Sequence, residues 1–164
     1  GVVFDGAGVG SCYFFHLTYS GELSGLEGGQ NLNDLTGNFA LSNFVVVNRN
    51  PLHAGKIFGG PYTFTVDGTP DMVSGIRLDD TKLNGSIQRW VITDDKNNIL
   101  GLPPTLEAVE GVDFDEAGEG ICLIWHITYE EGLIGLEAGG NLLSGLEGNY
   151  AVSNSIRVTR LKKH

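Results

Sequence analysis

The chain contains one segment twice, and this duplication limits the possible folds more than any other feature of the sequence. Residues 1–49 recur as residues 111–160, at an offset of 110 that becomes 111 after one extra residue near Gly145. Counting along this alignment gives 26 identical positions over the 49 residues of the first copy. A repeated segment indicates a repeated structural unit, so we expect both copies to adopt the same fold.

The two copies flank a different stretch, residues 50–110, which holds all five prolines. Two arrangements fit this layout. In one, residues 50–164 form a complete module, and residues 1–49 are the back half of a preceding module. In the other, the copies are pseudo-symmetric parts of one body. We favour the first arrangement, because a module of about 110 residues has the size of an immunoglobulin-like sandwich.

Alternation of side chains predicts strands in both copies. Bulky residues form one face of each strand, and we expect that face to point into a core. In the first copy, FVVVNR is apolar on both faces, so we expect this strand to be covered on both sides. The bulky residues are Tyr13, Phe15, Leu17 and Tyr19 in the first copy, and Leu123, Trp125, Ile127 and Tyr129 in the second.

The remaining patterns also favour strands and turns. PYTFTVDG alternates as a strand, and QRWVITDDKNNIL places a polar turn at residues 94–98 between two apolar runs, as in a hairpin. LEGGQNLNDL predicts a loop with at most a single helical turn, because glycine disfavours helix. Turns that need positive φ account for the 25 glycines. The sequence therefore predicts an all-β, immunoglobulin-like antiparallel β-sandwich.

Charge and hydropathy exclude several classes of partner. The formal net charge of −10 would repel phosphate backbones and anionic lipid, so we expect no nucleic-acid binding. Because no apolar run is long enough to span a bilayer, we expect no membrane insertion. The sequence starts in mid-pattern without an N-terminal signal, and we interpret it as a mature fragment from which any export signal has been removed.

Two residue pairs occupy equivalent positions in the copies. Cys12 and Cys122 are either disulfide candidates, between copies or between chains, or half-buried free thiols. His16 and His126 follow four residues later; positions i and i+4 on a strand lie ~13 Å apart, so a cysteine and a histidine of one copy cannot share a metal. We expect packed strand histidines, and we expect no enzyme, because no nucleophile, base and orienting group occur in a recognisable pattern.

Acidic loops are the candidate metal sites. Calcium takes six to eight oxygen ligands from flexible loops, and the best candidates lie in DGTPD and TDDKNN. The alternative is that these side chains cap backbone amides in turns. The sequence thus predicts either no cofactor or calcium, and the candidate ligands are Asp67, Asp71, Asp94, Asp95 and Asn97.

Several phrases together resemble a tandem repeat of very large secreted or cell-surface proteins of marine and environmental bacteria, notably Bacteroidetes. They are GGPYTFTVDGTPD, WVITDDKNNILGLPP, EGVDFDEAGEGICLIWHITYEEGLIGLEAG and GNYAVSNSIRVTR. The resemblance covers residues 57–160 and the back half of the unit before. It implies an extracellular β-sandwich module. In that repeat, further cysteines often occur near the positions of Thr65, Asn38 and Asn149, so the resemblance implies a reduced disulfide framework here.

From these observations we expect a non-enzymatic extracellular module with a structural or adhesive role, one that forms filaments by strand addition and is stiffened by calcium. Its partners would be neighbouring repeats or identical subunits. The alternative is a carbohydrate-binding module that uses exposed aromatic residues on surface glycans. The candidate aromatic residues are Trp90, Tyr62 and Tyr150.

Overall fold

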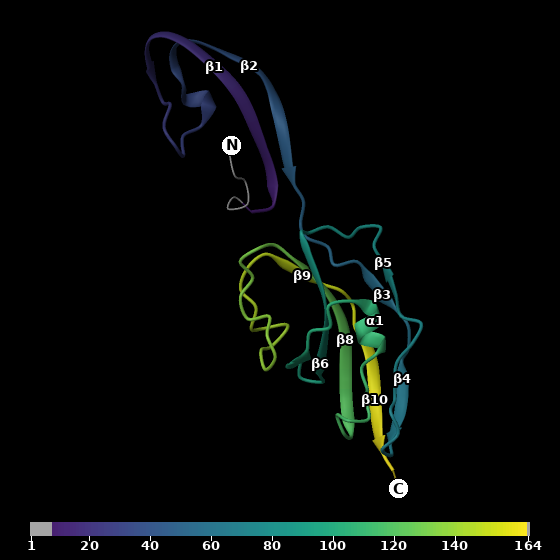
Figure 1. Ribbon diagram of the computed structural model, residues 1–164. Coiled ribbons are helices and arrows are strands. Elements are labelled where there is room, and N and C mark those ends of the chain that lie inside the picture. Colours follow the sequence, from purple (N-terminus) through teal and green to yellow (C-terminus); the bar gives the residue numbers. More distant parts are fainter. Residues whose placement is uncertain (1–7, 164) are drawn as a thin grey trace. The chain divides into compact units, whose positions relative to one another are not determined.

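The computed structural model describes residues 8–163. The chain divides into two compact units, Gly1–Pro51 (unit 1) and Leu52–His164 (unit 2). This division lies within two residues of the boundary expected from the duplication. Strands are the main regular secondary structure of both units, which confirms the all-β prediction (Figure 1). In the part of the chain that is described, no helix has the length and apolar character needed to cross a membrane.

Unit 1 is built around one long antiparallel hairpin of β1 (Gly10–Ser24) and β2 (Thr36–Arg49). The connection between them contains a single 3-10 turn, η2 (Leu32–Asp34), as predicted for LEGGQNLNDL. Gly25 has a φ of +86°, and a Cβ atom at this position would lie 2.7 Å from the carbonyl oxygen of Asp34. Only glycine fits such a conformation without strain. Gly135, its equivalent in unit 2, has the same φ.

Unit 2 is organised around one six-stranded sheet. Its strands are β4 (Tyr62–Val66), β6 (Ile87–Asp94), β7 (Ile99–Gly101), β8 (Gly120–Tyr129), β9 (Tyr150–Val152) and β10 (Ile156–Lys162). The order is β4-β10-β8-β6-β7, and β9 also pairs with β8. The predicted β4 strand and β6–β7 hairpin are confirmed. All these pairs are antiparallel except β4 with β10, which is parallel and departs from the purely antiparallel prediction. The immunoglobulin-like strand arrangement stays a prediction.

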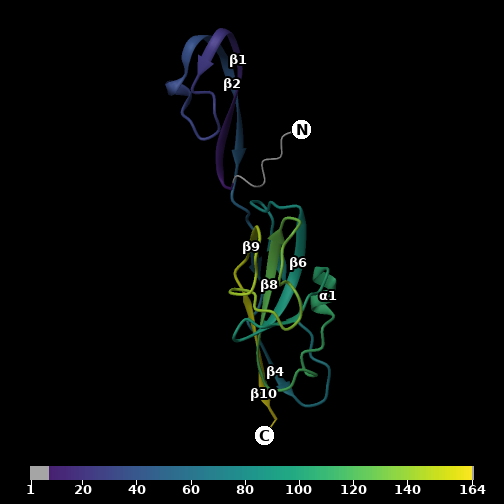
Figure 2. The same ribbon diagram turned by 90° about the vertical axis from the view of Figure 1, so that its left-hand side faces the viewer.

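Both faces of this sheet are covered. On one face, the first core joins β6, β8 and β10 to a small sheet, β3 (Lys56–Phe58) with β5 (Arg77–Asp79), and to helix α1 (Leu106–Glu110). Figure 2 shows α1 beside the sheet. On the other face, a second core contains Val91, Ile127 and Leu142. The sequence patterns had not predicted α1, whose first turn is capped by the Thr105 hydroxyl.

Three predictions about burial are wrong. The bulky face of β1 does not point into a core, because Tyr13, Phe15 and Tyr19 are exposed. In β8 the face expected to point outward, with Cys122 and His126, is the more deeply buried, while Trp125 on the bulky face is half-buried. The reason is that β3, β5 and α1 cover the Cys122 face. In unit 1 the FVVVNR strand is not covered on both sides, because Val45 is 64% exposed.

Candidate strand-accepting interface

The hairpin of unit 1 is a two-stranded sheet with two open edges. Within residues 8–163, β1 pairs with β2, and neither strand pairs with a third. An open edge offers a row of backbone N–H and C=O groups to any strand that approaches it. An isolated hairpin is marginally stable in water, since it lacks a second layer to cover its apolar side chains.

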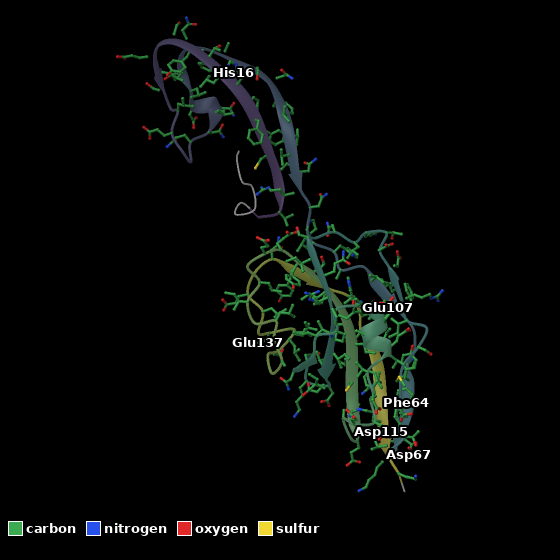
Figure 3. All side chains as sticks on the ribbon, viewed as in Figure 1. His16, Phe64, Asp67, Glu107, Asp115 and Glu137 are labelled. Carbon is green, nitrogen blue, oxygen red and sulfur yellow. The ribbon has the colours of Figure 1, made fainter. Side chains whose placement is uncertain are left out.

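The side chains of this hairpin are apolar and exposed. Of residues 8–51, Leu35 alone is buried. Tyr13, Phe15 and Phe44 form a cluster of aromatic rings with centroids 5.3 and 5.6 Å apart, and all three remain exposed. Figure 3 shows His16 among the side chains of this hairpin. The other large exposed apolar residues on its strands are Tyr19, Leu41, Val45 and Val46.

Unit 2 contains the same hairpin in the same register. Strand β8 corresponds to β1, and β9 with β10 corresponds to β2. Every described partner pair of the β8 hairpin has its counterpart in the β1 hairpin at the offsets of the sequence duplication. Examples are Cys12–Val47 and Cys122–Val158, Thr18–Ala40 and Thr128–Ala151, and Tyr19–Phe39 and Tyr129–Tyr150.

In unit 2 this hairpin is covered by the front half of the module, residues 52–110. Strand β6 pairs with β8 in antiparallel direction, and β4 pairs with β10 in parallel direction. Residues of the front half supply much of the first core, including Ile57, Val73 and Trp90. As a result Ile156, the equivalent of Val45, is 4% exposed.

Polar side chains of the unit 2 hairpin also bind the backbone of the front half. The Asn154 side chain accepts a hydrogen bond from the Ile57 N–H at 2.9 Å and donates one to the Ile57 carbonyl at 2.8 Å. The His126 ring contacts the Ala54 carbonyl at 2.7 Å through Nδ1, which must carry the proton to donate. The Thr128 hydroxyl donates to the Asn84 carbonyl at 2.7 Å.

The environment of His126 favours the neutral form of its ring. Burial lowers the pKa of the imidazole below its usual value, and the hydrogen bond to Ala54 opposes this effect only in part. The indole of Trp90 meets the ring edge-on, with 5.2 Å between ring centroids. His126 is a packed strand residue, as predicted, but the same prediction is wrong for His16, which is exposed because none of the described residues covers its face of the hairpin.

The equivalents of these three binding residues are identical in unit 1. They are His16, Thr18 and Asn43. The local backbone is also the same, because the His16 N–H donates to Ser42 Oγ at 2.9 Å, as the His126 N–H donates to Ser153 Oγ. Yet His16 and Thr18 are exposed, whereas His126 and Thr128 are fully buried. Unit 1 therefore carries the front-half binding groups on an uncovered hairpin.

Sequence reasoning missed Asn154 and Thr128 as residues that bind the front half of the module, and with them their unit 1 equivalents, Asn43 and Thr18. The available signal was their identity in both copies, on strands where many apolar neighbours had changed. His16 and His126 had been noted, but only as packed residues. In unit 2 the partner of His126 lies 72 positions away and the partner of Asn154 lies 97 positions away, so no local pattern points to them.

Cys12 and Cys122 are both free thiols. Cys122 is buried in the first core, and this burial raises the pKa of its thiol, while the nearby Arg160 partly opposes the shift. Cys12, at the equivalent position, is half-buried.

The predicted calcium ligands lie in two separate loops. Asp94 organises the β6–β7 turn: Oδ1 accepts the backbone N–H groups of Lys96 and Asn98, at 2.9 and 2.8 Å. Burial raises the pKa of this carboxyl, but the hydrogen bonds from Asn98 and Lys96 outweigh it and leave the pKa lowered. Asp95 and Asn97 occupy the same turn, and Asn97 has a positive φ of 67°.

The second loop lies at the end of β4. The Asp67 side chain accepts from the Thr69 N–H, and the Asp115 carboxylate accepts from the backbone of Asp67 at 2.8 Å (Figure 3). Burial raises the pKa of Asp71, and the negative charges of Asp115, Asp67 and Asp113 raise it further. Among the described residues, no three His, Cys, Asp or Glu side chains converge in a way that could hold a metal ion. Of the predicted ligands, Asp67 and Asp94 cap turns.

The aromatic residues considered for sugar stacking are engaged in packing. Trp90 is buried in the first core. The Tyr62 hydroxyl donates to the Ser74 carbonyl at 2.5 Å, and Tyr150 packs against the second core. A comparison of the chain with protein-family models finds no match, and comparisons with curated proteins and with solved structures find none either.

Proposed function

We propose that this chain is a structural repeat protein that acts by assembly, and that unit 1 is its strand-accepting element. The observation that carries the proposal is that unit 1 repeats the register of the covered hairpin of unit 2 but lacks the cover. Strand addition to an open sheet edge is a common mode of protein association, in which main-chain hydrogen bonds supply affinity and side-chain pockets supply specificity.

The energetics favour association through this surface. Large aromatic and aliphatic side chains of β1 and β2 are exposed together, and burial of apolar area contributes about 25 cal/mol per Å². Exposed apolar patches of this kind mark interaction sites on soluble proteins. We propose a mechanical or adhesive role rather than a catalytic one, and the resemblance to secreted bacterial repeats supports a location outside the cell.

The oligomeric state tests this proposal. Light scattering after size-exclusion chromatography compares the full chain with a chain lacking residues 1–49, over a range of concentrations. Unit 2 has both of its cores within residues 57–158, so it can be studied alone. We expect the full chain to have a mass above that of the monomer, rising with concentration, and the shortened chain to be monomeric. Monomers in both cases would refute assembly through unit 1.

A matched pair of substitutions locates the surface. Val45→Lys places a charge on the exposed face of β2, where Val45 is 64% exposed, and Leu161→Lys places one on an exposed strand position of unit 2, where Leu161 is 50% exposed. We expect Val45→Lys to reduce association at least tenfold and Leu161→Lys to leave it unchanged, because a buried unpaired charge strongly opposes association. Equal effects of the two changes would contradict the assignment to unit 1.

A further inference from the structure

We infer that the natural occupant of unit 1 is the front half of another module of the same repeat, with the strand and contact pattern of residues 52–110. This inference rests on the proposed function and names its partner. A strand like β6 would pair antiparallel with β1, and a strand like β4 would pair parallel with β2, as they do on β8 and β10.

The number of halves in the chain excludes this chain's own module as the donor. The sequence holds two back halves, residues 1–49 and 111–160, but one front half, residues 50–110. In unit 2 that front half is already paired with β8 and β10. Exchange of front halves between identical copies of residues 1–164 would leave one back half uncovered in each copy. The occupant must therefore be an additional front half.

The polar residues of unit 1 specify where this occupant binds. By equivalence with Asn154, the Asn43 side chain would hold the N–H and C=O of the residue that corresponds to Ile57. His16 Nδ1 would donate to the carbonyl that corresponds to Ala54, and a tryptophan like Trp90 would cover its ring. Unpaired strand edges attract many segments, but only a segment with these backbone groups at these positions satisfies the three side chains.

The exposed apolar residues of unit 1 correspond to residues that the front half covers in unit 2. Val45 is exposed, whereas its equivalent Ile156 lies in the first core of unit 2 with Val158. Val47, the equivalent of Val158, faces Cys12 across the hairpin in the same register. A front half of the same type would close both positions, since it closes them in unit 2.

The direct test adds a second front half to the full chain. Residues 52–110 are placed before Gly1, so that the new junction Glu110–Gly1 repeats the natural junction Glu110–Gly111. Hydrogen exchange is measured for the β1 and β2 amides in the extended and the parent chain. We expect exchange at the strand edges to slow by at least tenfold in the extended chain. Exchange as fast as in the parent chain would overturn the inference, and protection of the unit 2 amides shows that the rest of the chain has folded.

A matched substitution tests the contact pattern. Asn43→Ala should accelerate exchange in β1 and β2 about tenfold in the extended chain, because two hydrogen bonds are lost, and have no effect in the parent chain. Asn38→Ala is the control: its side chain donates to Ser20 Oγ at 2.9 Å within the hairpin, so its effect should be equal in both chains. Equal effects of Asn43→Ala in both chains would contradict the assignment.

Disulfide trapping tests the register independently of exchange rates. Asp94 lies opposite Cys122, so Asp94 of the added copy should lie opposite Cys12. In the extended chain, Asp94→Cys in the added copy should form a disulfide with Cys12 on oxidation, and the neighbouring Thr93→Cys should not. Absence of the Asp94→Cys disulfide would refute the register.

The outcomes separate this inference from the proposed function. If the parent chain associates through unit 1 but the extended chain gains no protection, assembly stands and the partner is wrong. If the extended chain is protected and the parent chain is a monomer at every concentration, the partner is right and self-assembly is wrong. Loss of association when the front half is added would support both.

Discussion

The contact between Asn154 and Ile57 joins the two halves of the unit 2 module, and its removal gives the sharpest prediction. Asn154→Ala deletes two hydrogen bonds, of 2.9 and 2.8 Å, to the backbone of Ile57. Each such bond contributes about 0.5–1.5 kcal/mol, and the Ile57 groups would be left without their partner. Because Asn154 itself is exposed, water can replace part of the loss. We expect a destabilisation of about 2 kcal/mol.

Tryptophan fluorescence during urea unfolding measures this change. Both tryptophans of the chain, Trp90 and Trp125, belong to unit 2, so the signal reports on that unit. With a urea dependence of about 2 kcal/mol per M, the midpoint should fall by about 1 M. A fall of less than about 0.25 M, equivalent to about 0.5 kcal/mol, would refute the reasoning.

The duplication supplies the control for this experiment. Asn43→Ala is the same chemical change at the equivalent position of unit 1, where the described residues provide no front half. We expect the tryptophan-monitored midpoint to be unchanged. An equal shift for both variants would mean that the effect does not arise from the Ile57 contact.

Two further predictions concern titratable groups in the core. Because burial lowers the pKa of His126 below 6.5, the unfolded state binds more protons than the folded state, and the urea midpoint of unit 2 should fall as the pH falls below about 6.5. His126→Asn should make the midpoint less dependent on pH, and an unchanged pH dependence in this variant would contradict the role of His126. The Cys122 thiol is buried and has a raised pKa, so it should react with a thiol reagent only when unit 2 unfolds, whereas the half-buried Cys12 should react in the native protein. Equal reaction rates of the two thiols would contradict the difference in their burial.

The strands and the correspondence of the two copies could be predicted from sequence. Alternation is a local property, so Tyr62–Val66 and the β6–β7 hairpin follow from it directly. The repeated segment predicted equal shapes, and the shared register of Cys12–Val47 and Cys122–Val158 confirms that prediction.

Burial and strand neighbours could not be predicted in the same way. Both faces of β8 carry apolar residues, so alternation could not decide which face is more deeply buried, and the choice of the Trp125 face was wrong. The parallel pairing of β4 with β10 joins segments nearly a hundred residues apart, and period-two patterns contain no information about such neighbours. The candidate interface could not be predicted for the same reason, since the role proposed for Asn43 follows only from the long-range contact of Asn154 with Ile57.

Equivalent residues of the two hairpins show which properties come from the hairpin itself and which come from the front half that covers it. Val45 and Ile156 occupy the same register position, yet one is 64% exposed and the other 4%. The hairpin register is therefore the same with and without a front half, whereas the burial of Ile156 depends on the front half. If the proposed function holds, the back half in unit 1 is covered only when a front half reaches it. Under that proposal, the front half that binds unit 1 determines which modules assemble.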